Sequence, residues 1–64
     1  TIPYGVTVEL LSGTWTNNMM LKNNGTILLD PGTNFINVKG GIYKGSGMFN
    51  GNFQNAGGTI SPGN

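Results

Sequence analysis

Residues 5–15 read GVTVELLSGTW and residues 33–43 read TNFINVKGGIY, and the likeness between these two stretches decides the predicted fold. Residues 6–10 alternate cleanly between apolar and polar side chains, as a half-buried β-strand does, and residues 35–38 alternate less perfectly. Chemically similar residues then coincide at an offset of 28. The superposed pairs are Val8 with Ile36, Leu10 with Val38, Gly13 with Gly41, and Trp15 with Tyr43.

A second pair of stretches extends the repeat. Residues 21–27 (LKNNGTI) match residues 53–60 (FQNAGGTI), which superposes Leu21 on Phe53 and Ile27 on Ile60. We therefore predict two copies of a unit of about 30 residues, because repeats of 20–50 residues are typical of solenoids. The first coil is expected at about residues 5–32 and the second at about residues 33–64.

Strand signals fill both units, with Gly, Asn or Pro between them, and helical periodicity is almost absent. One such unit cannot bury its own apolar side, whereas stacked units bury each other. The pattern predicts an all-β parallel β-solenoid with four internal ladders. These are Val8/Ile36, Leu10/Val38, Leu21/Phe53 and Ile27/Ile60.

Two other folds compete with the solenoid. An antiparallel meander is suggested by Asn24-Gly25 and Asn50-Gly51, each a strong hairpin signal. Disorder is suggested by 12 Gly and only 8% charged residues, but 36% hydrophobic residues argue against it. The recurrence over a whole unit favours parallel coils.

Corner residues offer a further prediction. Pro31-Gly32 and Pro62-Gly63 suit type II turns, in which Gly supplies the positive φ. The repeat places Asn23 over Asn55, where the amides either stack in a hydrogen-bonded ladder or occupy left-handed turns. The turn interpretation is favoured for the asparagines as a set.

Residues 41–64 read GIYKGSGMFNGNFQNAGGTISPGN, which resembles the passenger-associated repeats of bacterial autotransporter adhesins. The resemblance covers about 20 residues closely. It implies an extracellular right-handed β-helix at the bacterial cell surface, although the chain has no room for a membrane translocator barrel. The matching positions are Gly45, Gly47, Phe49, Gly51, Phe53, Asn55, Gly57 or Gly58, Ile60, Pro62, Gly63 and Asn64; the first half keeps only Asn24, Gly25, Ile27, Pro31 and Gly32.

Composition narrows the function classes. A net charge of +1 is too weak to attract nucleic acid or an anionic membrane, and no apolar run approaches the about 18 residues that span a bilayer. With no Cys and no His, disulfides and the usual metal ligands are missing, so no cofactor or metal is expected. The only acids, Glu9 and Asp30, fall in different segments of the repeat, so no enzyme is predicted.

The predicted function is structural or adhesive. Because the chain starts at Thr1 rather than Met, a processed product or a fragment is expected. Neither terminus resembles a polar cap, so copies are expected to stack head to tail. The alternative is recognition of surface glycans through Trp15 and Tyr43, provided that both rings point outward rather than into the core. An ice-binding row at Thr14 and Thr16 is not repeated in the second unit.

Overall fold

The computed structural model describes residues 1–62, and these residues form strands and turns without any helix. No helix that is long and apolar enough to cross a bilayer therefore occurs in this part of the chain. The strands are β1 (Thr7–Leu10), β2 (Thr14–Asn17), β3 (Met20–Lys22), β4 (Thr26–Leu29), β5 (Asn34–Val38), β6 (Ile42–Gly45), β7 (Met48–Asn50), β8 (Asn52–Ala56) and β9 (Thr59–Pro62).

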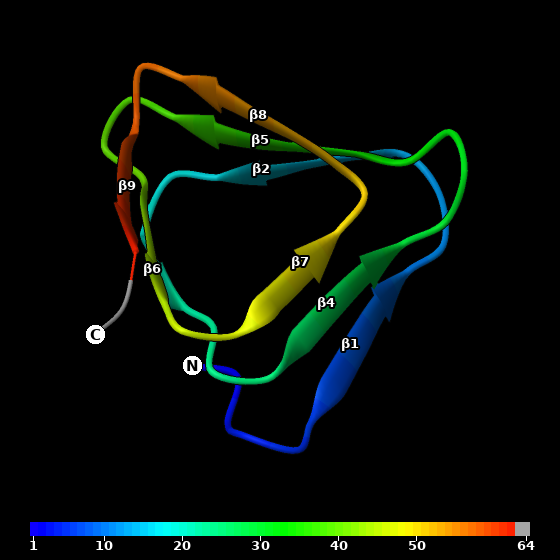
Figure 1. The fold of residues 1–64 in the computed structure, drawn as a ribbon. Coiled ribbons are helices and arrows are strands. Elements are labelled where there is room, and N and C mark those ends of the chain that lie inside the picture. The colour runs from blue at the N-terminus through cyan, green and yellow to red at the C-terminus, as the bar shows by residue number, and fades with distance from the viewer. Residues whose placement is uncertain (63–64) are drawn as a thin grey trace.

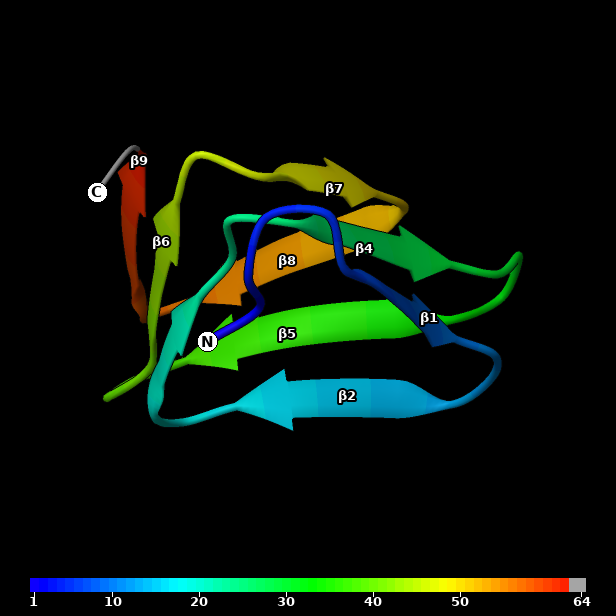
Figure 2. The ribbon, with the colours of Figure 1, turned by 90° about the horizontal axis from the view of Figure 1, so that it is seen from below.

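Three parallel sheets form the three sides of a triangular coil (Figure 1), with strand orders β1-β4-β7, β2-β5-β8 and β3-β6-β9. In Figure 2 the strands of one side lie one above another. The chain runs anticlockwise in Figure 1 while it rises through the stack toward the viewer, so the winding is right-handed. The fold is the predicted parallel β-solenoid, with principal extents of 28 × 27 × 14 Å.

The length of the coils differs from the prediction. Paired residues lie between 17 positions apart, as for Ile42 and Thr59, and 22 positions apart, as for Ile27 and Phe49. The 62 described residues therefore make about three coils of about 20 residues, not two of about 30. The coil boundaries predicted at residues 5–32 and 33–64 are wrong for the same reason.

The four predicted ladders are also wrong in their pairing. Val8 pairs with Ile27 and Leu10 with Leu29, both across β1 and β4. The offset of 28 had superposed each strand on the fourth strand after it, and larger offsets superposed strands five apart, whereas stacked strands are three apart. Apolar residues lie on both the inner and the outer faces of these strands, as in Thr26–Leu29 and Asn34–Val38. A shift by four strands can therefore match residue chemistry while it moves the residue to the next side of the triangle.

Most of the predicted ladder residues nevertheless face the interior, in different columns. The interior columns are Val8–Ile27–Phe49, Leu10–Leu29, Trp15–Phe35–Phe53 and Leu21–Tyr43–Ile60. Ile36 and Val38 alternate with the buried Phe35 and Asn37, so they lie on the outer face of β5. Their assignment to the interior is therefore wrong.

The turn at Asp30–Thr33 is the one that the sequence predicts. Gly32 has a φ of 86°, and the Thr33 amide donates to the Asp30 carbonyl oxygen at 3.0 Å. The equivalent turn at Pro62-Gly63 extends beyond the described residues. All ladders between named strands are parallel, which excludes the antiparallel meander despite its two Asn-Gly signals.

Replacing Ile27 by Ala should lower the free energy of unfolding by about 2–5 kcal/mol, because the removed carbons leave a cavity between coils. Ile27 is 2% exposed at the centre of the stack. Ile36→Ala is the matched control on the outer face, and it should cost only about 1 kcal/mol. Urea unfolding followed by circular dichroism measures both. Equal losses would contradict the assignment of faces.

Candidate functional site

Three stacked asparagines occupy one inner corner of the coil. Asn17, Asn37 and Asn55 are paired in register across β2, β5 and β8. The Asn17 amide nitrogen (Nδ2) donates to Asn37 Oδ1 at 2.9 Å, and Asn37 Nδ2 donates to Asn55 Oδ1 at 3.1 Å. Both side-chain hydrogen bonds run in the same direction, from the first coil toward the last. We call these three residues the asparagine ladder.

The asparagine ladder also donates hydrogen bonds to backbone carbonyl groups at the corner that follows it. Asn17 Nδ2 donates to the Ile42 carbonyl oxygen at 3.3 Å, and Asn37 Nδ2 donates to the Thr59 carbonyl oxygen at 3.0 Å. A Cβ at Gly41 or Gly58 would collide with the Asn37 amide, so both glycines are required for this close approach. Burial of Asn37, which is 0% exposed, is tolerated because its amide is hydrogen-bonded.

Asparagine amides do stack in a hydrogen-bonded ladder, as one of the two interpretations predicted. The predicted pair, Asn23 and Asn55, is not part of one ladder. Asn23 and Asn55 lie at different corners, and Asn23 instead bridges two coils by donating to the Tyr43 hydroxyl at 3.0 Å and to the Met48 carbonyl oxygen at 2.8 Å. Among the described residues, no residue other than glycine has a positive φ. The favoured interpretation of the asparagines as left-handed turn residues is therefore wrong.

Replacing Asn37 by Ala should cost about 3 kcal/mol or more, because it leaves donors and acceptors of the neighbouring coils buried without partners. Asn34→Ala is the matched control in the same strand, since Asn34 is exposed, and it should change stability by less than about 0.5 kcal/mol. The urea midpoint of each variant measures the difference. If Asn37→Ala is as stable as Asn34→Ala, the asparagine ladder does not hold the corner together.

An aromatic cluster fills the rest of the interior. Phe35, Tyr43, Phe49 and Phe53 come from all three sides of the coil, with ring centroids 5.0–6.4 Å apart. Phe35 and Phe53 are stacked, and the other pairs meet edge to face. Tyr43 therefore points inward, where its hydroxyl accepts a hydrogen bond from Asn23.

The proposed glycan face of Trp15 and Tyr43 does not form. Trp15 pairs with Phe35 in β5, and Tyr43 belongs to another side of the triangle, where it pairs with Leu21 and Ile60. Trp15 lies in an interior column, and its indole nitrogen donates to the Ser12 carbonyl oxygen at 3.1 Å. It is 46% exposed because no described coil lies beyond it.

The two ends of the coil stack carry most of the uncovered interior. In the middle coil Ile27 is 2% and Phe35 is 6% exposed. In the same kinds of interior column, Trp15 at the first coil and Ile60 at the last are 46% and 45% exposed. The sequence indicated that the ends lack caps. It could not identify Trp15 and Ile60 as the residues exposed there, because that identification requires the coil length. We call these surfaces the first and last end faces.

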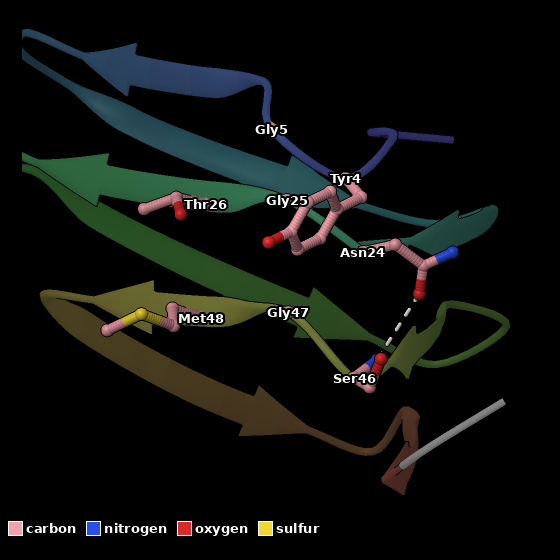
Figure 3. A pocket seen from close by; sticks show the side chains of 8 residues that line it. All are labelled: Tyr4, Gly5, Asn24, Gly25, Thr26, Ser46, Gly47 and Met48. Atoms are coloured by element: carbon pink, nitrogen blue, oxygen red, sulfur yellow. Dashed lines mark hydrogen bonds between the residues drawn. The ribbon is translucent and has the colours of Figure 1, made fainter.

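A shallow groove of about 400 Å³ crosses the side of the coil stack near the N-terminal segment (Figure 3). Three stretches line it, residues 4–5, 24–26 and 46–48, and Tyr4 projects over it with 92% of its surface exposed. The Ser46 amide donates to Asn24 Oδ1 at 3.3 Å across the groove. Its lining residues include no Asp, Glu, Lys or Arg.

The two acids of the chain are brought together, contrary to the expectation that they lie in separate segments. Glu9 lies in β1, and Asp30 follows the adjacent β4, with its amide donating to the Leu10 carbonyl oxygen at 3.0 Å. A side-chain hydrogen bond with Asp30, and then charge repulsion between the carboxylates, raises the pKa of Glu9 above 4.5. Within residues 1–62, no three acidic, His or Cys side chains gather as a metal site.

The stability of the protein should fall as the pH rises from 4.5 through the raised pKa of Glu9, because folded Glu9 holds its proton more tightly than unfolded Glu9. Above that range the repulsion between the carboxylates persists. Glu9→Gln should therefore flatten the pH dependence and raise the melting temperature at pH 7. Thermal unfolding between pH 4 and 8 tests this, and an unchanged slope in the variant would rule out the carboxyl pair as its cause.

Comparisons of the chain with family models, with curated protein sequences and with solved structures find no match. The candidate site therefore rests on geometry alone. Its two parts are the asparagine ladder and the end faces onto which that ladder opens.

Proposed function

We propose that this chain is a structural or adhesive module of an extracellular bacterial fibre, adhesin stalk or sheath, and that it joins copies of itself end to end. The observation that carries the proposal is the exposure of the interior-column residues Trp15 and Ile60 at the two ends. Their middle-coil neighbours are less exposed, since Phe35 is buried and Tyr43 is half-buried. An exposed strand edge beside uncovered apolar side chains is a template for another strand.

The sides of the triangle support the same proposal. The lateral face offers a shallow groove without charged groups, and the two acids form a pair that no other acidic, His or Cys side chain joins among residues 1–62. The end faces, in contrast, repeat the shape and chemistry of the contacts that already hold the coils together. A contact between unlike ends does not close on itself, so its repetition makes a fibre.

The bacterial and extracellular setting is supported by the resemblance of residues 41–64 to autotransporter adhesin repeats. It is also supported by a surface that uses Asn, Gly, Thr and Ser with only 8% charged residues. In a longer polypeptide, adjoining coils would cover the same two end faces.

The protein should sediment as assemblies that grow with concentration in the micromolar range, and negative-stain images should show filaments. Trp15→Lys should yield a folded monomer, because it puts a charge into an end face and leaves the middle coil intact. The control Met48→Lys puts the same charge on the outer face of β7, where Met48 is 68% exposed, and should assemble normally. A wild-type protein that stays monomeric would overturn the proposed function.

A further inference from the structure

The asparagine ladder has a direction, and we propose that this direction makes assembly one-way, with the last end face of one copy against the first end face of the next. The inference rests on the proposed end-to-end association and adds its polarity and register. In that register β7, β8 and β9 of one copy pair with β1, β2 and β3 of the next. The occupant of each end face is thus a second copy of this chain.

The donors and acceptors at the two ends are complementary. Among residues 1–62, Asn55 Nδ2 donates only to the Gly58 carbonyl oxygen at 3.0 Å, so it keeps a second hydrogen to donate. At the other end, the one bond that Asn17 Oδ1 accepts from the described residues is a long one of 3.4 Å, from the Met19 amide. The last end face therefore presents a ladder donor, and the first end face presents a ladder acceptor.

The bonds within one copy specify the bonds of the junction. Asn37 Nδ2 donates to Asn55 Oδ1 and to the Thr59 carbonyl oxygen of the coil above. By the same register, Asn55 Nδ2 would donate its second hydrogen to Asn17 Oδ1 of the next copy, beside the Met20 carbonyl oxygen, since Met20, Ile42 and Thr59 share one column. If two first end faces met, two Asn17 acceptors would face each other, and if two last end faces met, two Asn55 donors would do so. Neither arrangement would form the ladder hydrogen bond.

The contacts that other side chains would make at this junction are compatible with the same direction of assembly. Trp15 of the next copy would cover Phe53, continuing the column in which Phe35 and Phe53 are stacked with their centroids 5.3 Å apart. On the outer face, Glu9 of the next copy would lie over Asn50, and its Lys22 over Ser61. No charge meets a like charge at the junction, which would be unfavourable between paired strands.

One corner of the junction is crowded. Ile2 lies beneath Asn23, and Pro62 lies above Gly45, which itself stacks on Asn23. Ile2 of the next copy and Pro62 would therefore meet at the same level of one column. The proposed junction therefore requires the N-terminal segment to leave this column, which breaks the hydrogen bonds of Ile2 with Lys22 and Asn24, each 2.8 Å long.

Cysteine cross-linking tests the direction, since the chain has no cysteine of its own. Thr16 and Gln54 share an outer column, with Ile36 between them, so within one copy they are about 9.6 Å apart and too distant for a disulfide. Across the proposed junction they are neighbours at about 4.8 Å. An equimolar mixture of Thr16→Cys and Gln54→Cys proteins should therefore give the mixed dimer on mild oxidation, identified by its mass.

Each single variant alone is the control, and neither should form a disulfide dimer in its assemblies. Dimers in a single-variant sample, or filaments without any mixed dimer, would overturn the one-way register while leaving end-to-end assembly intact. Wild-type protein that sediments as a monomer overturns the proposed function itself. The two failures are therefore distinguishable.

Asn55→Asp tests the ladder as the cause of the direction. The carboxylate still accepts the bond from Asn37 but repels Asn17 Oδ1 of the next copy, so the critical concentration at pH 7 should rise about tenfold or more. Protonation near pH 3 restores a donor and should restore assembly. The control Asn52→Asp carries the same charge on the outer column of Asn34, and it should assemble like wild type at both pH values. Equal behaviour of the two variants would exclude the asparagine ladder.

Discussion

The side chains inside this solenoid are buried by the coils on either side of them, and this constraint shapes every other feature of the molecule. A single turn of three short strands encloses too little volume to cover its own apolar side. Parallel pairing in register places each interior residue on its counterpart one coil away, so a column closes only where coils lie on both sides. Ile27 has two such neighbours, Val8 and Phe49, and is buried. Ile60 has one described neighbour, Tyr43, and is half exposed.

Stacking by columns explains why polar residues can sit inside so small a protein. A lone buried amide would cost several kcal/mol, but amides stacked at the strand spacing satisfy one another and the carbonyl groups of the adjacent turn. Asn37 lies in the middle of such a stack and is fully buried. The asparagine ladder therefore specifies the register at one corner, because a slip by one residue would place the amide on the outer face.

Sequence patterns predicted the all-β class and the parallel stacking, since alternation, glycine-rich corners and recurrence are local signals. They did not predict the coil length. Val8 matches Ile36 in chemistry as well as it matches Ile27, and nothing local distinguishes the third following strand from the fourth. Coils of 17 to 22 residues also vary at their corners, which blurs any fixed period. The pairing of Glu9 with Asp30 and the inward position of Tyr43 both depend on that length, so both escaped prediction.

If copies join as proposed, folding and assembly would draw on the same kind of contact, and the coils would contribute to the two processes unequally along the stack. The middle coil already has a neighbour on each side, so its residues contribute to folding and add nothing new on assembly. Each end coil has a described neighbour on one side only, so in the proposed assembly its other side would contact the next copy. Phe53 illustrates the difference, because it stacks on Phe35 below and has no described coil on its other side. A junction that repeated the coil-to-coil contact would have the geometry of the fold itself. In the proposed assembly, its specificity would come from the polarity of the asparagine ladder rather than from a separate recognition element.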